Sequence, residues 1–169
     1  MIKDIQVSNL QDASVLAKTD HTFDVWIFAV DQENQQDVQQ IQKDNYMNGN
    51  DVQYITQYFY DFHDKQEGGP SQENVDTYIN SLEELSLEED VEHNVLVISV
   101  ANISRSPAIA FLGWYIVTNE KQAAWERIRK NGIVVYPNPN ILRLADHFFK
   151  NRCAPPHLED FVREQRDKQ

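Results

Sequence analysis

The sequence has little of three features that would restrict its class: cysteine, long apolar runs and positive charge. Cys153 is the only cysteine among 169 residues, so no disulfide can form within the chain. No apolar run approaches the ~20 residues that span a bilayer. The N-terminal stretch "MIKDIQVSNLQ" also lacks the basic start and apolar core of a signal peptide. These absences predict a soluble protein of the cytoplasm with no membrane partner.

Positive charge is outweighed by negative charge throughout the chain. Lys and Arg number 15 against 27 Asp and Glu, which gives a formal net charge of −12 at pH 7. Such a charge repels nucleic-acid backbones and anionic membrane surfaces at long range. Nucleic acid is therefore excluded as a general partner, and any anion that binds must be captured locally.

The length suits one compact domain with a full hydrophobic core. The hydrophobic fraction of 41% is ordinary for a globular protein. We expect a single domain over residues 1–169, in which residues 155–169 form a short C-terminal tail that is either amphipathic or frayed.

Strand and helix patterns alternate along the chain, which begins as β-α-β. A polar loop is the alternative to a helix over 32–45, and Ser71 is expected to cap the helix that follows it. The fold class expected is α/β, with a central, mostly parallel sheet flanked by helices. The strands are predicted at 4–8, 23–30, 51–62 and 94–99, and the helices at 9–18, 32–45, 72–85, 107–117, 120–130 and 140–150.

The stretch "NVLVISVANISRSPAIAFLGWYIV", residues 94–117, combines a buried strand, a short polar loop and an apolar helix. Pro107 suits the first turn of that helix, and Ser106 is expected to cap it. A loop that leads into a helix N-terminus directs several unpaired N–H groups at one point. Arg105 adds a planar fork of donors that matches two oxygens of a phosphate. The stretch predicts a site for a phosphate-sized dianion; the alternative is a helix cap with a structural salt bridge.

Residues 98–106, "ISVANISRS", resemble the signature of the cysteine-based protein tyrosine and dual-specificity phosphatases, His-Cys-x-Ala-Gly-x-Ser-Arg-Ser. The loop length, Ala101 and the Ser-Arg-Ser end match. The later "PNPNILRLADHFF" resembles bacterial phosphatase-like proteins of similar size. The resemblance implies a tyrosine phosphatase-like fold whose loop, between a central strand and a helix, binds phosphate. It assigns phosphate binding to Ser99, Val100, Ala101, Asn102, Ile103, Ser104 and Arg105.

Three departures from that signature concern its chemistry. Ser99 stands where the family has its nucleophilic cysteine, and Ile98 stands where the family has the histidine that helps to set the thiolate. A serine hydroxyl needs an adjacent base to become a nucleophile, and none lies nearby in sequence. Asn102 replaces a glycine, but asparagine tolerates a positive φ better than most residues. The loop is therefore expected to keep its shape and to lose the usual chemistry.

The resemblance also implies a general acid on a loop that precedes the signature. Asp61 and Asp64 in "FYDFHDKQEGG" are the candidates, and His63 lies beside them. An ordinary role as loop carboxylates is the alternative for both, and a surface position is the expectation for His63.

Metal binding is the other chemistry that the sequence can be searched for. His147, Cys153 and His157 are spaced too loosely for a zinc site, so we expect no metal and no cofactor. The three tryptophans, which lie in strand or helix patterns, are expected to pack in the core or in half-buried positions: Trp26, Trp114 and Trp125.

The sequence as a whole favours a catalytically inactive, tyrosine phosphatase-like protein. It would bind a phosphorylated ligand or phosphoprotein through residues 99–105. One alternative is an active phosphatase whose cysteine has been replaced by Ser99 to trap a substrate; departures at Ile98 and Asn102 argue against a single engineered change. Another alternative is a pure interaction scaffold whose loop binds nothing. The oligomeric state is left open.

Overall fold

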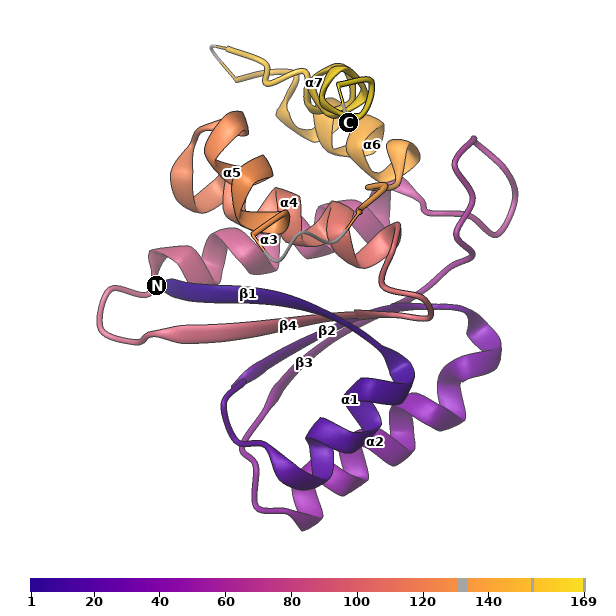
Figure 1. Ribbon diagram of the computed structural model, residues 1–169, viewed down its shortest axis with the longest axis vertical. Coiled ribbons are helices and arrows are strands. Elements are labelled where there is room, and N and C mark those ends of the chain that lie inside the picture. The colour runs from indigo at the N-terminus through magenta and orange to yellow at the C-terminus, as the bar shows by residue number, and fades with distance from the viewer. Residues whose placement is uncertain (131–133, 153, 169) are drawn as a thin grey trace.

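A four-stranded sheet lies at the centre of the protein (Figure 1). The computed structural model describes residues 1–130, 134–152 and 154–168. The strands are β1 (Ile2–Asn9), β2 (Val25–Val30), β3 (Gln53–Tyr58) and β4 (His93–Ser99), in the order β1-β4-β2-β3. Each pair of neighbouring strands is parallel. The expected α/β fold with a central parallel sheet is confirmed, and β4, predicted as a buried central strand, lies between β1 and β2.

Helices cover both faces of the sheet (Figure 1). The α1 and α2 helices cover one face; α3 and α4 cover the other, with the later helices packed outside them. No helix in the described part of the chain is long and apolar enough to cross a bilayer. The bounds are α1 (Leu10–Thr19), α2 (Gln35–Met47) after a 3-10 turn (Gln32–Asn34), α3 (Gln72–Leu87), α4 (Arg105–Thr118), α5 (Lys121–Ile128), α6 (Pro139–Phe149) and α7 (Leu158–Arg166).

The core consists of two hydrophobic clusters, one on each face of the sheet, and β2 contributes to both. Successive side chains of a strand point to opposite faces, and every residue of β2 is buried. A strand that is buried on both faces is typical of a parallel sheet. Val25, Ile27 and Ala29 pack with α3 and α4, whereas Trp26, Phe28 and Val30 pack with α1 and α2. The expectation that Trp26, Trp114 and Trp125 are core or half-buried residues is confirmed, since all three are buried.

Two of the expected helix caps can be compared with the structure. Ser71 caps α3 as predicted, in a reciprocal capping box with Asn74. The prediction that Ser106 caps α4 is wrong, because the helix begins at Arg105 and its N-cap is Ser104. Ser106 lies inside the first turn, where its hydroxyl is free to contact the preceding strand. The helix predicted over 120–130 is α5, which ends at Ile128; the Asn131-Gly132 pair, which was expected to end this helix, lies outside the described residues.

The C-terminal segment ends in a helix that is docked on the domain. The carboxylate of Asp146 on α6 accepts hydrogen bonds from the backbone amides of Leu158 at 2.7 Å and Glu159 at 3.0 Å, and so caps α7. Phe161 stacks on Phe111 of α4 with 6.2 Å between the ring centroids. Of the two alternatives for residues 155–169, the amphipathic helix is therefore the one found over 158–166.

The strand predicted over 51–62 is found as β3, which ends at Tyr58, because the chain turns away from the sheet after Phe59. Phe59 still donates its amide to the carbonyl of Val30, but the amide of Tyr60 turns to the carbonyl of Gly68 at 2.8 Å. This bond closes a loop over residues 59–70. Because the strands are parallel, that loop meets the segments that follow β2 and β4 at one edge of the sheet. In open α/β sheets this carboxyl edge is where ligands bind.

Candidate anion-binding site

The loop from Ser99 to Arg105 joins the carboxyl end of β4 to the N-terminus of α4. Asn102 adopts φ 45°, in the left-handed region, as its tolerance of positive φ allows. This turn leaves several backbone N–H groups of the loop without an acceptor among the described residues: those of Ala101, Ile103 and Ser104. The first N–H groups of α4 add to them, since a helix cannot satisfy its own N-terminal donors.

Ser99 lies buried beneath this loop. Its Oγ is 2.9 Å from the Oγ of Ser106 and accepts a hydrogen bond from the amide of Asn102 at 3.2 Å. Across the described residues, no histidine or carboxylate contacts this hydroxyl. Ile98 points to the other face of the sheet, where it packs in the cluster under α1 and α2. The hydroxyl at the nucleophile position therefore has hydrogen-bonding partners but no base.

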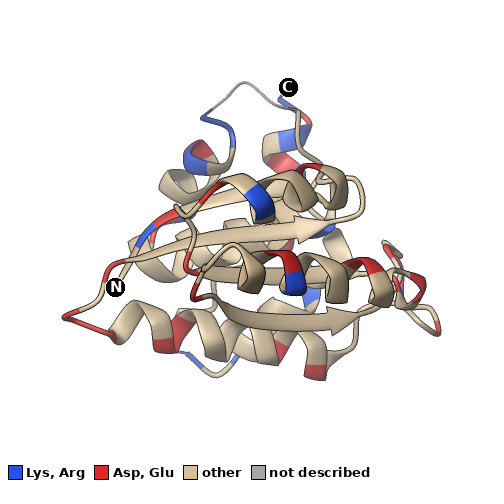
Figure 2. Ribbon diagram, turned by 90° about the horizontal axis from the view of Figure 1, so that it is seen from below, with Lys and Arg blue, Asp and Glu red and all other residues tan. Residues whose placement is uncertain are grey.

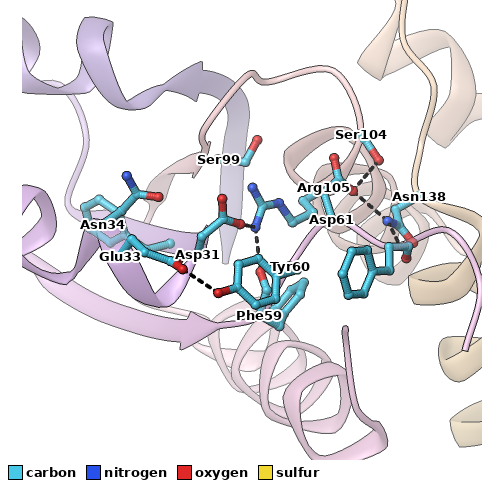
Figure 3. Close-up of polar contacts among 12 residues, drawn as sticks. Asp31, Glu33, Asn34, Phe59, Tyr60, Asp61, Ser99, Ser104, Arg105 and Asn138 are labelled. Carbon is cyan, nitrogen blue, oxygen red and sulfur yellow. Dashed lines mark hydrogen bonds and ion pairs between the residues drawn. The ribbon is translucent and has the colours of Figure 1, made fainter. Parts of the chain in front are cut away.

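The guanidinium of Arg105 lies at the centre of the site (Figure 3). Its side chain is 4% exposed, and Nη1 donates both to Oδ1 of Asp31 and to the carbonyl of Phe59, each at 2.6 Å. The Nε atom is buried and has no acceptor among the residues that the structure describes. Burying such a donor without a partner costs about 1–3 kcal/mol. The site therefore has one cationic donor that an incoming anion would satisfy.

Aromatic residues form the floor under this guanidinium. The Cζ of Arg105 is 5.9 Å from the ring centroid of Phe59, and the edge of Phe59 packs against Tyr78. Tyr78 donates its hydroxyl to the carbonyl of Phe28 at 2.8 Å. Burial raises the pKa of Tyr78 well above its ordinary value, although the positive charge of Arg105 opposes this shift. Tyr78 therefore stays neutral and adds no negative charge beneath the guanidinium of Arg105.

The two candidate general acids occupy different positions. The Oδ1 atom of Asp61 accepts a hydrogen bond from the hydroxyl of Ser104 at 2.8 Å, which brings Asp61 against the loop (Figure 3). Asp64 is exposed, and it is its backbone carbonyl that is bonded, to Nδ2 of Asn140 at 3.2 Å. His63 is half exposed, with Nε2 3.2 Å from the hydroxyl of Ser104. The one histidine near the loop thus contacts Ser104 and not Ser99.

Asn138, which the sequence did not single out, connects the loop with the segment of Asp61. Its Nδ2 donates to Oδ1 of Asp61 at 2.7 Å and to the carbonyl of Phe62 at 3.2 Å. Its Oδ1 caps α6 by accepting from the amide of Ile141 at 3.1 Å. Its own amide donates to the carbonyl of Ser104 at 3.0 Å. Through its side chain and its backbone amide, this one buried residue therefore connects three chain segments: the loop, the segment of Asp61 and α6.

Solved structures with the same arrangement of elements are tyrosine and dual-specificity phosphatases. No family model matches the chain, and no curated protein matches it in sequence. Human DUSP28 superposes with a TM-score of 0.58 at 13% identity, covering 89% of this chain and 90% of that one. PTPMT1 in complex with PI(5)P gives 0.58 at 16% identity over 98% and 94%. A human tyrosine phosphatase-like serine/threonine/tyrosine-interacting protein gives 0.54 at 17% identity over 83% of each chain.

The chain has the tyrosine and dual-specificity phosphatase fold. Residues 98–106 predicted this fold. The structural similarity extends over far more of the chain than that stretch. Within the phosphatase fold, Asp31 and Asn138 are the polar residues of the site that sequence reasoning missed. Asp31 could have been found as the first polar residue after a buried strand of the sheet, and Asn138 as an N-cap residue that precedes a proline.

Replacing Asn138 with alanine is expected to lower the free energy of unfolding by about 2–3 kcal/mol, because a buried helix cap and two partly buried hydrogen bonds are lost together. Urea denaturation would measure the change. Asn80, exposed on α3, provides a matched control, for which alanine should change stability by less than about 0.5 kcal/mol. Equal stability of the two variants would contradict the connecting role of Asn138 in this phosphatase fold.

Two of the three residues considered for a metal site, His147 and His157, lie in the described part of the chain. His147 lies on α6 and His157 is the N-cap of α7, while Cys153 lies outside the described residues. The described ranges contain no group of three or more histidine, cysteine, aspartate or glutamate side chains that could hold a metal ion.

Proposed function

We propose that this protein is a catalytically inactive, phosphatase-like protein that binds a phosphorylated ligand or phosphoprotein through residues 99–105. The observation that carries the proposal is the buried Nε of Arg105, which has no acceptor among the described residues. It lies at the end of a loop in which the amides of Ala101, Ile103 and Ser104 likewise have none there. A phosphate oxygen would satisfy these donors together. Charge-assisted hydrogen bonds of this kind are about twice as strong as neutral ones.

The proposal of inactivity is supported by the surroundings of Ser99. A hydroxyl attacks phosphorus only if a base removes its proton, and the contacts of Ser99 Oγ are a second hydroxyl and a backbone amide. His63, on the segment after β3, does not contact Ser99; its Nε2 lies against the hydroxyl of Ser104 instead. Binding without turnover would agree with one structural neighbour, which is called a phosphatase-like interacting protein.

Calorimetric titration with phosphate, vanadate and phosphotyrosine tests the proposal. Arg105→Ala is expected to raise the Kd of each by at least about tenfold, because the charge-assisted hydrogen bond from Nε, of about 1.5–3 kcal/mol, is lost. Arg163, exposed on α7 with Asp160 as its partner, is the matched control, and its replacement by alanine should leave binding unchanged.

Arg105 is buried, so the alanine variant must first be shown to be folded by circular dichroism and thermal melting. Arg105→Lys is the second variant, since lysine keeps the charge for Asp31 but has no equivalent of Nε. A folded lysine variant is expected to bind phosphate at least about tenfold more weakly. Absence of binding to the parent protein, or equal binding by all variants, would overturn the proposal and favour a pure interaction scaffold.

A further inference from the structure

The anion-binding loop is surrounded by carboxylates. The segments that follow β2 and β3 lie next to the loop through Asp31 and Asp61, and they carry only one lysine, Lys65. Red segments mark these loops at the end of the molecule to which the strand arrows point (Figure 2). The acidic residues of the two segments form an acidic rim beside the loop: Asp31, Glu33, Asp61, Asp64 and Glu67.

Most of these carboxylates are exposed, whereas Asp31 is 30% exposed and paired with Arg105. Glu33, Asp64 and Glu67 are exposed. Tyr60 donates its hydroxyl to Glu33, and this hydrogen bond lowers the pKa of Glu33 below its ordinary value. Arg105 is buried and pairs with Asp31, so its charge is not paired with the exposed carboxylates of the two segments. A ligand with several negative charges would be repelled here, whereas positive charges beside its phosphate would be attracted.

Apolar side chains are exposed on and beside the loop, next to the acidic rim. Val100 and Ile103, within the loop, are 39% and 48% exposed. The amide of Tyr136 donates to the carbonyl of Ile103, which brings a partly exposed tyrosine to the same place. Tyr60 lies on the acidic side of the site, beside Glu33. Apolar contact area around a single anion site suits a ligand larger than a free sugar phosphate.

From these charges and contacts we infer that the ligand is a phosphorylated polypeptide segment with basic residues beside its phosphate, an inference that rests on the proposed function. A phosphoinositide would present its phosphate from an anionic membrane surface, which the net charge of −12 and the acidic rim disfavour. A polypeptide supplies the two features that the rim selects, because basic side chains meet the carboxylates while neighbouring apolar side chains cover Val100 and Ile103.

Three phosphotyrosine peptides of equal length test the inference, with arginine, alanine or glutamate on both sides of the phosphotyrosine. Fluorescence anisotropy should give the arginine peptide a Kd about tenfold below that of the alanine peptide at low salt, and the glutamate peptide the weakest binding. Because rim charges are screened, the preference should shrink as the ionic strength rises to about 1 M. Vesicles with and without a phosphoinositide are the competing probe.

The contribution of the rim is separated from that of the loop by a double variant, Glu33→Gln with Glu67→Gln. It should reduce the arginine preference at least about threefold and leave the Kd for inorganic phosphate within about twofold. The matched control is Glu84→Gln with Glu89→Gln, two exposed glutamates that precede the start of β4 in the chain. This control should change neither the arginine preference nor the Kd for inorganic phosphate.

Each outcome distinguishes the inference from the proposed function. If inorganic phosphate and vanadate fail to bind, the proposed function fails. If they bind in an Arg105-dependent way but the three peptides bind equally, only the inference about basic segments fails. Tighter binding to phosphoinositide vesicles than to the arginine peptide would also overturn it, and would assign the site to a lipid headgroup.

Discussion

Replacing Asp31 with alanine is expected to lower the free energy of unfolding by about 2 kcal/mol, because Arg105 keeps a buried charge and loses its carboxylate partner. The side chains of the pair are 4% and 30% exposed. The partial exposure of Asp31 makes the expected loss smaller than the ~3–5 kcal/mol found when a fully buried pair is broken. Urea denaturation would measure the change. Asp51, an exposed loop carboxylate, is the control, and its alanine variant should differ from the parent by less than about 0.5 kcal/mol.

The same substitution is expected to increase the stabilisation that phosphate gives. In the parent protein Asp31 already supplies a negative charge to Nη1 of Arg105, whereas in the variant a bound anion would supply it. Any ligand that binds only the folded state raises its stability by mass action. Thermal melting at increasing phosphate should therefore show a larger rise for Asp31→Ala than for the parent. Identical rises would mean that Asp31 does not share Arg105 with an anion.

The parts of the molecule that the sequence predicted are those with local causes. The continuous apolar run before Ser99 indicated a strand that is buried on both faces, and β4 is that strand. The serine before residues 72–85 indicated a capped helix, because an N-cap depends on residues only three positions apart. The positive φ of Asn102 followed from the same kind of local preference.

The parts that the sequence did not predict depend on contacts between distant segments. Arg105 meets Asp31 and Phe59 across 74 and 46 residues, and Asn138 meets Asp61 across 77. Such pairs are brought together by the order of the strands, which hydrophobic periodicity does not encode. The misplaced cap at Ser106 is an error of a different kind, because the helix end is uncertain by one or two residues and the sequence offers two candidate serines there, Ser104 and Ser106.

Replacing Ser99 with cysteine is expected to create a thiol whose pKa lies below the usual value of about 8.5. The hydroxyl of Ser106, the amide of Asn102 and the N-terminus of α4 would stabilise a thiolate in the same place where they now surround Ser99. Alkylation by iodoacetamide as a function of pH measures this directly. The experiment is made in a Cys153→Ser background, since Cys153 is the only natural cysteine.

The expected result is rapid alkylation at neutral pH that phosphate slows, because the anion would cover the thiolate. Adding Ser106→Ala to the cysteine variant removes one hydroxyl donor and should raise the pH at which alkylation is half-maximal. A thiol that reacts no faster than a free cysteine would contradict the electropositive character of the loop, and with it the premise that the loop receives anions.

Hydrolysis of an aryl phosphate is the second property to measure in the Ser99→Cys variant. Turnover needs a proton donor for the leaving group as well as a nucleophile, and Oδ1 of Asp61 is already bonded by Ser104 and Asn138. We therefore expect the variant to have a reactive thiol but to hydrolyse the aryl phosphate at a rate no more than about tenfold above that of the parent protein. A fold shared with phosphatases does not by itself supply their chemistry. A rise of about a thousandfold or more would mean that one exchange separates this chain from an active enzyme, as the alternative of a serine introduced at position 99 requires.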